Sequence, residues 1–334
     1  MSEEPLASIV VTTYNNADTI EECLRSLVEQ TYAKKEIIVV YDEGSKDGTK
    51  EALERLAASY KGSFRVISVP HMGRSEARNV GWRNSKGDVV FFADADDVYF
   101  KDYLEKAVSK LESDPQMGCV CLTGSSLTTG KGFLAGCMEV YSMLQQANVE
   151  KGSFKPSWAW VYRREVLEKV GGFDKSLEQA EDKDLFMRVT GIDYRVGLVT
   201  GLNWLHRRPP NLWTHLKKTY LGGVRRILFV AKHGEWRRLV LELTPFWLIV
   251  LLLMLSILYV PVLVFTLACL TIFIAADTAR VARLVWSRAD KKRYVFLYPV
   301  FGLITYLFSA AGHIHGLLSL PLKRKRLRKL DRCH

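Results

Sequence analysis

The segment "VVFFADADD" (Val89–Asp97) decides the fold of this chain. Its first five residues are apolar, and they lead directly into three aspartates, Asp94, Asp96 and Asp97. A short apolar run of this kind predicts a strand buried on both faces. In open α/β sheets, ligands gather at the carboxyl ends of the strands, which is where these carboxylates would lie. The sequence therefore predicts a functional site at the end of a buried strand.

Strand-like and helix-like segments alternate in the residues before this run. We expect strands at 7–12, 36–41 and 64–69, and helices at 17–30, 49–59 and 74–85. Thr19 and Glu22 have the spacing of a capping box at the start of the first helix. Alternation of this kind favours a doubly wound α/β domain with a mostly parallel sheet.

The charge of the chain is divided unevenly. Residues 201–334 hold 22 Lys or Arg and 5 Asp or Glu, a net charge of +17, whereas residues 1–200 carry −6. The six cysteines have neither the spacing of a zinc site nor that of a disulfide framework. The acidic N-terminus lacks the pattern of a cleavable signal peptide, so we expect none. The uneven charge indicates that residues 1–200 and 201–334 form two parts with different properties.

The aspartates at the strand end need a partner. Alternate residues of an extended strand point the same way, so Asp94 and Asp96 can converge while Asp97 faces elsewhere or begins a turn. Two ionised carboxylates repel each other unless they share a cation. Oxygen ligands favour Mg²⁺ or Mn²⁺ over zinc. We therefore expect a divalent cation here; the alternative is a solvated pair of aspartates at a turn.

An almost unbroken apolar run extends from Leu243 to Ala276. As one helix it would be about 50 Å long, too long for a single crossing of a ~30 Å hydrocarbon layer. Pro261 is a natural break. We expect membrane helices at about 244–260, 261–280 and 295–320; the alternative is a set of buried helices in a soluble protein.

Amphipathic and basic segments flank this region. Apolar residues recur at steps of three or four from Trp213 to Ala231, while Lys217 and Arg225 share another face. This pattern predicts a helix lying in the membrane interface, or else an amphipathic helix packed on a core. The basic tail predicts contact with anionic headgroups rather than nucleic acid. Three crossings from a cytoplasmic domain would put that tail outside, against the positive-inside tendency, so a re-entrant or interfacial segment stays open.

Five blocks in a fixed order carry a family resemblance. They are "SIVVTTYNN" (Ser8–Asn16), "EIIVVYDEGSKDGT" (Glu36–Thr49), "GRSEARNVGW" (Gly73–Trp82), "VVFFADADD" (Val89–Asp97) and "GGFDKSLEQAEDKDLFMRV" (Gly171–Val189). Together they resemble the inverting GT-A glycosyltransferases of family 2, over roughly residues 6–210. With the membrane segments, the chain is similar to cellulose-synthase-like enzymes and to mannosyltransferases that build lipid-linked glycans. The resemblance implies a Rossmann-like GT-A domain followed by an all-α membrane region.

The resemblance also implies a nucleotide-sugar site. The residues expected to bind the nucleotide sugar are Thr13, Tyr14, Asn15, Asp42, Arg78 and Asp94. Among them, Asp42 would accept hydrogen bonds from the base, and Arg78 would contact the diphosphate. The metal ligands would be Asp94, Asp96 and His206, although a lone histidine is also an ordinary polar residue. The metal would stabilise the charge on the departing nucleoside diphosphate.

The paired acids Glu181 and Asp182 match the family motif in which the aspartate takes the proton of the acceptor hydroxyl. A charged helix start is the alternative interpretation of this pair. A phosphate acceptor is already anionic and needs no base, so Asp182 favours a hydroxyl acceptor. Besides Glu181, we expect Trp160, Arg207 and Arg208 to contact the acceptor, with the arginines on its pyrophosphate.

These expectations combine into a membrane-bound inverting glycosyltransferase with its catalytic domain on the cytoplasmic face. It would move one hexose from a GDP- or UDP-sugar, with GDP-mannose as first candidate, to a lipid-linked glycan. The QxxRW block of processive synthases is absent between residues 200 and 240, which favours single-sugar transfer. The alternatives are a polyprenyl-phosphate sugar synthase, a haloacid-dehalogenase-like phosphatase and a non-catalytic nucleotide-sugar-binding protein.

The expected order of domains follows. We expect a catalytic domain over residues 1–205, interfacial amphipathic helices over 206–242, membrane helices within 243–322 and a basic tail over 323–334.

Overall fold

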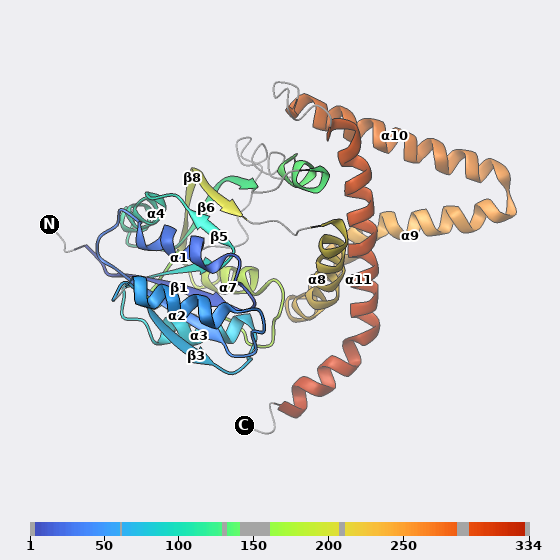
Figure 1. Cartoon of the computed structure of the whole chain (residues 1–334). Helices are drawn as coiled ribbons and strands as arrows, with labels where there is room; N and C mark the ends of the chain where they lie inside the picture. Colours follow the sequence, from blue (N-terminus) through green and yellow to red (C-terminus); the bar gives the residue numbers. More distant parts are fainter. Residues whose placement is uncertain are drawn as a thin grey trace. The chain divides into compact units, whose positions relative to one another are not determined.

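The computed structural model describes residues 4–60, 62–128, 132–140, 161–206, 211–285 and 294–330. The chain forms two compact units (Figure 1). The first unit comprises residues 1–129 and 145–207, and the second comprises residues 130–144 and 208–334. Residues 130–144 thus belong with the C-terminal helices, which the sequence did not indicate.

The first unit is built on an eight-stranded sheet with the order β3-β2-β1-β4-β7-β6-β8-β5. Its strands are β1 (Ala7–Thr13), β2 (Lys35–Asp42), β3 (Arg65–Val69), β4 (Val89–Asp94), β5 (Asp97–Tyr99), β6 (Met117–Thr128), β7 (Val161–Arg163) and β8 (Arg195–His206). Strands β3, β2, β1 and β4 run parallel to one another, whereas β7 is antiparallel to β4. The prediction of a mostly parallel α/β sheet is confirmed.

Helices cover both faces of the sheet in three layers. The described helices are α1 (Ile20–Val28), α2 (Thr49–Ser59), α3 (Arg74–Arg83), α4 (Tyr103–Glu112), α6 (Arg164–Val170) and α7 (Glu181–Thr190). Successive strand residues point to opposite faces. Phe91 of β4 therefore packs in the cluster with α1, α2 and α4, while Phe92 packs in the cluster with α6 and α7. This alternation buries β4 completely, as its apolar run predicts.

The predicted capping box does not form. Thr19 is the N-cap residue of α1, but its side chain makes no capping hydrogen bond. Its hydroxyl instead donates to the carbonyl oxygen of Asn16 at 3.3 Å. The loop between β1 and α1 therefore competes with the helix for this hydroxyl.

The second unit consists of helices. They are a helix over residues 133–140, α8 (Leu212–His233), α9 (Trp236–Leu258), α10 (Val260–Val285) and α11 (Tyr294–Leu330). Within the described residues, three helical stretches are long and apolar enough to cross a membrane: Trp236–Ile257, Pro261–Arg283 and Leu297–Pro321. The three expected apolar helices are therefore present. Helix α9 begins earlier than expected, and α11 continues into the basic tail.

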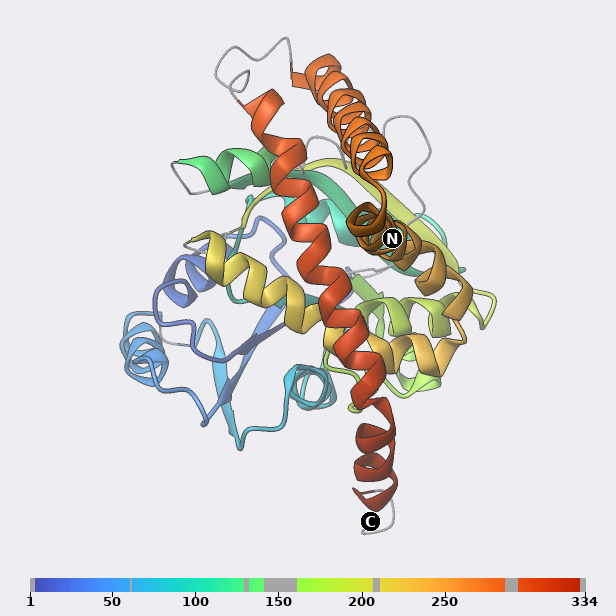
Figure 2. The same ribbon diagram turned by 90° about the vertical axis from the view of Figure 1, so that its right-hand side faces the viewer.

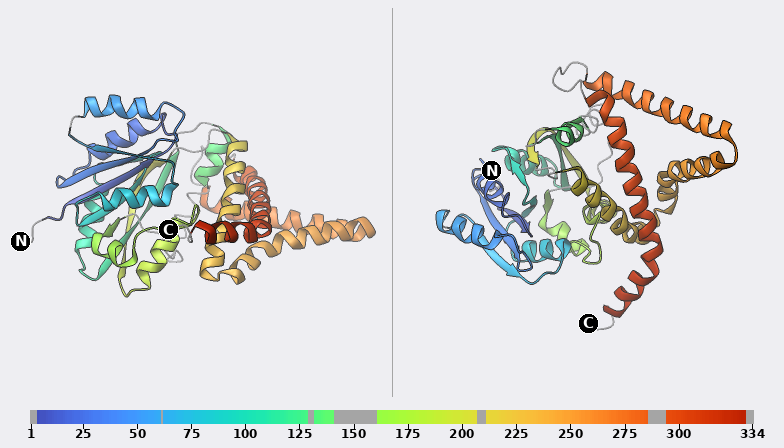
Figure 3. Two further views of the ribbon diagram at one scale, coloured as in Figure 1. Left: turned by 90° about the horizontal axis from the view of Figure 1, so that it is seen from below. Right: turned by 45° about the vertical axis from the view of Figure 1, so that its right-hand side comes forward.

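Helices α9 and α10 meet at a break beside Pro261. Figure 3 shows the sharp connection between the two helices. Tyr259 ends α9 in an extended conformation, and Pro261 lies in the first turn of α10, where a proline costs no helical hydrogen bond. Both helices expose large apolar side chains, among them Ile257 and Ile272. Exposed apolar surface on this scale marks a region that lipid or another apolar partner covers.

Helix α8 packs against α11 through glycines (Figure 2). A Cβ atom on Gly312 of α11 would lie 2.1 Å from the carbonyl oxygen of Tyr220 on α8. Gly316, one turn further along, is similarly close to the backbone of Val224. This spacing is the small-xxx-small pattern that lets two helix backbones approach closely. Val224 and Ile227 on the apolar face of α8 are therefore buried against α11, and the placement of α8 at a membrane interface stays a prediction.

We expect Gly312→Ala to lower the free energy of unfolding by about 1–3 kcal/mol, because its methyl group meets backbone that cannot move aside. Gly302→Ala, on the same helix, is the matched control, since a Cβ there has no heavy atom within 4 Å. Denaturant titration of the detergent-purified chain measures both. Equal stability of the two variants would contradict the close approach of α8 and α11.

Candidate functional site

The candidate site lies at the carboxyl ends of the parallel strands. In the register of the sheet, Thr12 of β1 is opposite Asp94 of β4, and Thr13 is opposite Tyr41 of β2. Asp42 and Asp94 therefore end the strands on either side of β1. This edge of a doubly wound sheet is the usual place for a ligand.

Arg78 joins three carboxylates at this edge. Its Nη1 donates to Asp182 Oδ1 at 2.7 Å and to Glu181 Oε1 at 3.2 Å, and its Nη2 donates to Asp94 Oδ1 at 2.9 Å. The Arg78 side chain is only 2% exposed, and its guanidinium lies over the Phe173 ring at 5.3 Å. The end of β4 and the start of α7 are thus held by one cation.

Burial by itself disfavours the charge on Arg78. The carboxylates of Asp182, Asp94 and Glu181 outweigh that penalty and raise the pKa of Arg78 above its usual value. The guanidinium therefore stays charged. In this structure the donors of the Arg78 guanidinium are used by carboxylates, and its contact with a diphosphate stays a prediction.

Asp182 is a partly exposed carboxylate with a raised pKa. Burial is the main influence on this carboxyl group and, with the charges of Glu181 and Asp94, raises the pKa of Asp182 to about 6, although Arg78 acts in the opposite direction. Its side chain is 33% exposed, so it is open on one side. Ala180, directly before the acid pair, has φ 62°, a left-handed conformation that is costly for a residue with a side chain. Strain of this kind is found where a structure presents functional groups.

Glu181 lies deeper than Asp182. Its side chain is buried, and its Oε1 accepts hydrogen bonds from both Arg78 and Arg74. Glu181 thus holds both arginines in place, and its contact with an acceptor stays a prediction.

The three aspartates after β4 differ in their surroundings. Asp97 is buried and begins β5, which agrees with the expectation that it points away from the other two. Asp94 uses Oδ1 for Arg78, while Oδ2 forms no hydrogen bond with a described residue. Asp96 is partly exposed and has no ion-pair partner within the described part of the chain. Asp94 is therefore paired with Arg78, Asp97 accepts from the Tyr99 hydroxyl at 3.5 Å, and the Asp96 carboxylate is available to a ligand.

This donor set fits a divalent cation. Two carboxylates with free oxygen atoms suit Mg²⁺ or Mn²⁺, which complete their coordination shells with water and substrate phosphate. No three described His, Cys, Asp or Glu side chains form a metal cluster by themselves. The backbone of His206 on β8 pairs with that of Asp97 on β5, so this residue lies on the strand next to the aspartates.

A second group of residues surrounds Asp42. Its carboxylate is buried, with Oδ1 accepting from the Gly44 N–H at 2.8 Å and Oδ2 lying 2.7 Å from His71 Nδ1. The His71 ring lies 4.9 Å from that of Tyr14, which is exposed. This arrangement offers an aromatic surface beside a carboxylate acceptor.

The loop after β1 is tied to the loop after β2. Asn15 has φ 53°, its N–H donates to Ser45 Oγ, and its Oδ1 accepts from the Lys46 N–H at 2.7 Å. Thr13 is buried at the end of β1, and its hydroxyl donates to Asn16 Oδ1. Thr13 and Asn15 therefore shape the loops, while Tyr14 presents the open surface.

Sequence reasoning missed two residues of the site. His71 follows β3 and pairs with Asp42, and Arg74 begins α3 with an exposed side chain that reaches Glu181 at 3.3 Å. Both follow the end of a parallel strand, so the rule that identified Asp42 and Asp94 could have found them. Trp160, Arg207 and Arg208 lie outside the described residues, as does the side chain of His206.

We expect Arg78→Leu to lower the free energy of unfolding by about 3–5 kcal/mol at pH 8, because it leaves carboxylates buried without a partner. Their folded-state pKa values rise when the guanidinium is lost, so the deficit grows with pH and shrinks toward pH 5. Denaturant titrations at both pH values measure this difference.

Arg83→Leu, on the same helix, is the control. Its side chain is half-exposed and lies 3.8 Å from Glu76, so we expect a change of at most about 0.5 kcal/mol. A deficit of Arg78→Leu that does not depend on pH would contradict the role of Arg78 as the shared cation.

Comparisons with known proteins agree with this geometry. Residues 8–171 match the family model "Glycosyl transferase family 2". The chain is 28% identical over 200 residues to Glycosyltransferase AglE of Haloferax volcanii, covering 57% of this chain and 63% of that protein. It is 27% identical over 226 residues to the probable glycosyltransferase YdaM of Bacillus subtilis, covering 64% and 53%. The matches thus span between about half and two thirds of these relatives.

A solved structure shares the fold. The mannosyltransferase PcManGT from Pyrobaculum calidifontis, in complex with GDP-Man and Mn²⁺, is 23% identical, with a TM-score of 0.62 over 95% of this chain and 88% of that one. The first unit therefore has the Rossmann-like GT-A fold. Residues 8–171 therefore carry a glycosyl transferase family 2 domain, which is similar to the corresponding part of these glycosyltransferases.

Proposed function

We propose that this protein is a membrane-bound inverting glycosyltransferase that moves one hexose from a nucleotide sugar to a hydroxyl of a lipid-linked glycan. The observation that carries the proposal is the cluster in which Arg78 joins Asp94, at the strand end, to Asp182, whose pKa is raised to about 6. A donor-binding carboxylate and a general base are thereby held on either side of one cation.

The chain's own groups supply the proton transfer and the orientation. Asp182 accepts the proton of the acceptor hydroxyl, and the oxygen attacks the anomeric carbon from the side opposite the leaving group. The bond from that carbon to the nucleoside diphosphate breaks with its electron pair on the diphosphate oxygen. Because the attack comes from the opposite side, the configuration inverts.

A divalent cation, Mg²⁺ or Mn²⁺, would be held by Asp94 and Asp96 and would supply charge for the departing diphosphate. His206 is proposed as a further ligand, since its backbone adjoins these aspartates. The fold neighbour PcManGT was solved in complex with Mn²⁺, which supports a divalent cation in this proposal.

The nucleotide would lie along the loops after β1 and β2. Tyr14 and His71 offer aromatic surfaces for the base, and Asp42 retains lone pairs for its N–H groups. Arg74, exposed at the start of α3, is better placed than Arg78 to meet the diphosphate. Mannose from GDP-mannose is the first candidate donor, supported by the GDP-Man complex of PcManGT.

The membrane setting rests on the three apolar helices of the second unit. A catalytic domain on the cytoplasmic face, with Trp160, Arg207 and Arg208 on the acceptor, completes the proposal. A lipid-linked acceptor suits an enzyme anchored in the bilayer, and the base Asp182 favours an acceptor alcohol over a bare polyprenyl phosphate.

We expect Asp182→Asn to keep donor binding and to lower transfer at least a hundredfold, since general-base catalysis contributes about 10²–10⁴. In the unmodified protein, kcat/KM should fall as the pH drops through about 6, because protonation removes the base. Transfer to an acceptor glycolipid, measured between pH 5 and 8, checks both expectations.

Asp193→Asn provides the matched control for the base. Asp193 is exposed beyond the end of the same helix, and its φ of 62° suits asparagine. Undiminished transfer by Asp182→Asn would contradict the proposed hydroxyl acceptor and would favour a polyprenyl-phosphate sugar synthase.

Turnover of a panel of sugar nucleotides, followed as slow hydrolysis without acceptor, should require Mg²⁺ or Mn²⁺ and identify the donor. We expect Asp96→Ala to abolish this turnover, because it removes the open carboxylate. Asp102→Ala, which loses only an exposed ion pair with Lys106, should behave as the unmodified chain. Equal turnover of all donors after exhaustive chelation of divalent cations would contradict the proposal.

A further inference from the structure

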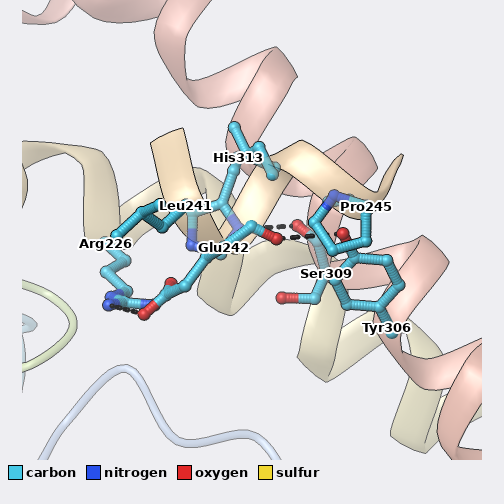
Figure 4. A pocket seen from close by; sticks show the side chains of 9 residues that line it. Arg226, Leu241, Glu242, Pro245, Tyr306, Ser309 and His313 are labelled. Atoms are coloured by element: carbon cyan, nitrogen blue, oxygen red, sulfur yellow. Dashed lines mark hydrogen bonds and ion pairs between the residues drawn. The ribbon is translucent and has the colours of Figure 1, made fainter. Parts of the chain in front are cut away.

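The second unit contains an open pocket whose largely apolar lining includes several polar side chains. Its volume is about 340 Å³, and residues of α8, α9 and α11 line it (Figure 4). The residues that bear on its chemistry are Arg226, Leu241, Glu242, Tyr306, Ser309 and His313. A volume of this size lies in the range of small-molecule sites, about 300–1,000 Å³.

His313 brings an unused acceptor to this cavity. The side chain is 5% exposed, and its Nδ1 lies 2.8 Å from the carbonyl oxygen of Ser309. A carbonyl oxygen only accepts, so Nδ1 carries the hydrogen and Nε2 of the neutral ring has a lone pair. That Nε2 is buried and has no hydrogen-bond partner among the described residues. A buried polar atom left without a partner is costly, so a hydrogen-bond donor is missing here.

A second acceptor arises where Pro245 interrupts the hydrogen bonding of α9. Proline has no N–H, so the carbonyl of Leu241 lacks its helical donor. One residue further on, the Tyr306 hydroxyl donates to the Glu242 carbonyl oxygen and accepts from the Phe246 N–H, each at 2.9 Å. The backbone hydrogen bonding of α9 is therefore incomplete on the side that faces the pocket. A ligand with several hydroxyl groups could satisfy both acceptors.

The wall on the α8 side is charged. Arg226 donates from both Nη atoms to the carboxylate of Glu242, at 2.7 and 3.1 Å, and Arg238 Nε donates to the same carboxylate at 3.0 Å. Residues 211–242 hold seven Lys or Arg and two Glu. Arg226 and Glu242, which line the pocket, pair with each other, and the excess of basic residues in this segment favours an anion in the neighbourhood.

The cavity also lies where charged sequence gives way to apolar sequence. Arg238 and Glu242 occupy the first two turns of α9, and the apolar run begins at Leu243. On α9 this boundary falls at the level of the lipid headgroups if the helix crosses a membrane. The lining residues of α11 lie within its apolar stretch Leu297–Pro321, so the pocket extends from that level toward apolar surface.

We propose that this cavity binds the head of an anionic membrane lipid that carries free hydroxyl groups. One hydroxyl donates to His313 Nε2, and the phosphate lies beside Arg226 and Arg238. The inference rests on the membrane placement in the proposed function, but not on the glycosyl transfer. The lipid is neither donor nor acceptor.

Native mass spectrometry of the delipidated full chain in detergent tests this inference. The probes are phosphatidylglycerol, phosphatidic acid, which is anionic but has no head hydroxyl, and free glycerol 3-phosphate. We expect phosphatidylglycerol to bind about tenfold more tightly than phosphatidic acid. His313→Leu should lower phosphatidylglycerol affinity to that of phosphatidic acid, a loss of about 1.4 kcal/mol for tenfold.

His315→Leu is the matched control, because His315 is exposed two residues further along and pairs with the Tyr220 hydroxyl. Equal binding of the two lipids to the unmodified chain would overturn the proposal without any variant, and so would a His313→Leu chain that keeps the preference. Competition by glycerol 3-phosphate at the same concentration would assign the site to a soluble phosphate instead. No sugar nucleotide enters the measurement, so its failure is separate from a failure of glycosyl transfer.

Discussion

The interaction on which the catalytic unit depends is the contact of one guanidinium with three carboxylates. Asp94 is 16 residues from Arg78 in the sequence, and Glu181 and Asp182 are 103 and 104 residues away. Without a shared cation, these carboxylates would repel each other, and the end of β4 and the start of α7 would move apart. A lysine could not replace it, because only the planar guanidinium offers several donors in fixed directions.

The position of Arg78 imposes a demand on the packing of α3. The helix must approach the sheet closely enough for its arginine to reach the end of β4. Gly81, one turn further along α3, permits this approach, because a Cβ there would lie 2.2 Å from Val10 Cγ1 of β1. The absence of a side chain at Gly81 and the charge of Arg78 therefore act together.

Much of this unit could be predicted from the sequence because its strands are uniformly apolar. The helix expected at 49–59 has the observed bounds, and the run from Val89 to Ala93 is buried as expected. The burial of Arg78 and Glu181 could not be predicted, since it depends on contacts over a hundred residues apart. From sequence alone, a charged residue is expected to be exposed to solvent. The role of His71 was missed for a related reason: a single histidine acquires meaning only beside Asp42.

In the second unit, too, long-range contacts between apolar helices could not be predicted from the sequence. Hydropathy identified α9 and α10, whose side chains face outward, but it does not indicate what covers the apolar face of α8. The close approach of Gly312 to Tyr220 places α11 on that face. Backbone proximity of this kind is encoded by glycine spacing rather than by hydropathy. The Tyr306 hydroxyl that joins the interrupted turn of α9 is equally invisible to a hydropathy profile.

The cluster around Arg78 also bears on how basic Asp182 can be. A base must be ionised at working pH and still hold a proton well, so a pKa close to the working pH is best. Burial and the charges of Glu181 and Asp94 raise the pKa of Asp182, and Arg78 limits the rise. An arginine paired with Asp182 alone would hold the pKa of this carboxyl group low, whereas the negative charges of Asp94 and Glu181 beside it raise that pKa. The carboxylates around Arg78 thus affect the basicity of Asp182 as well as its position.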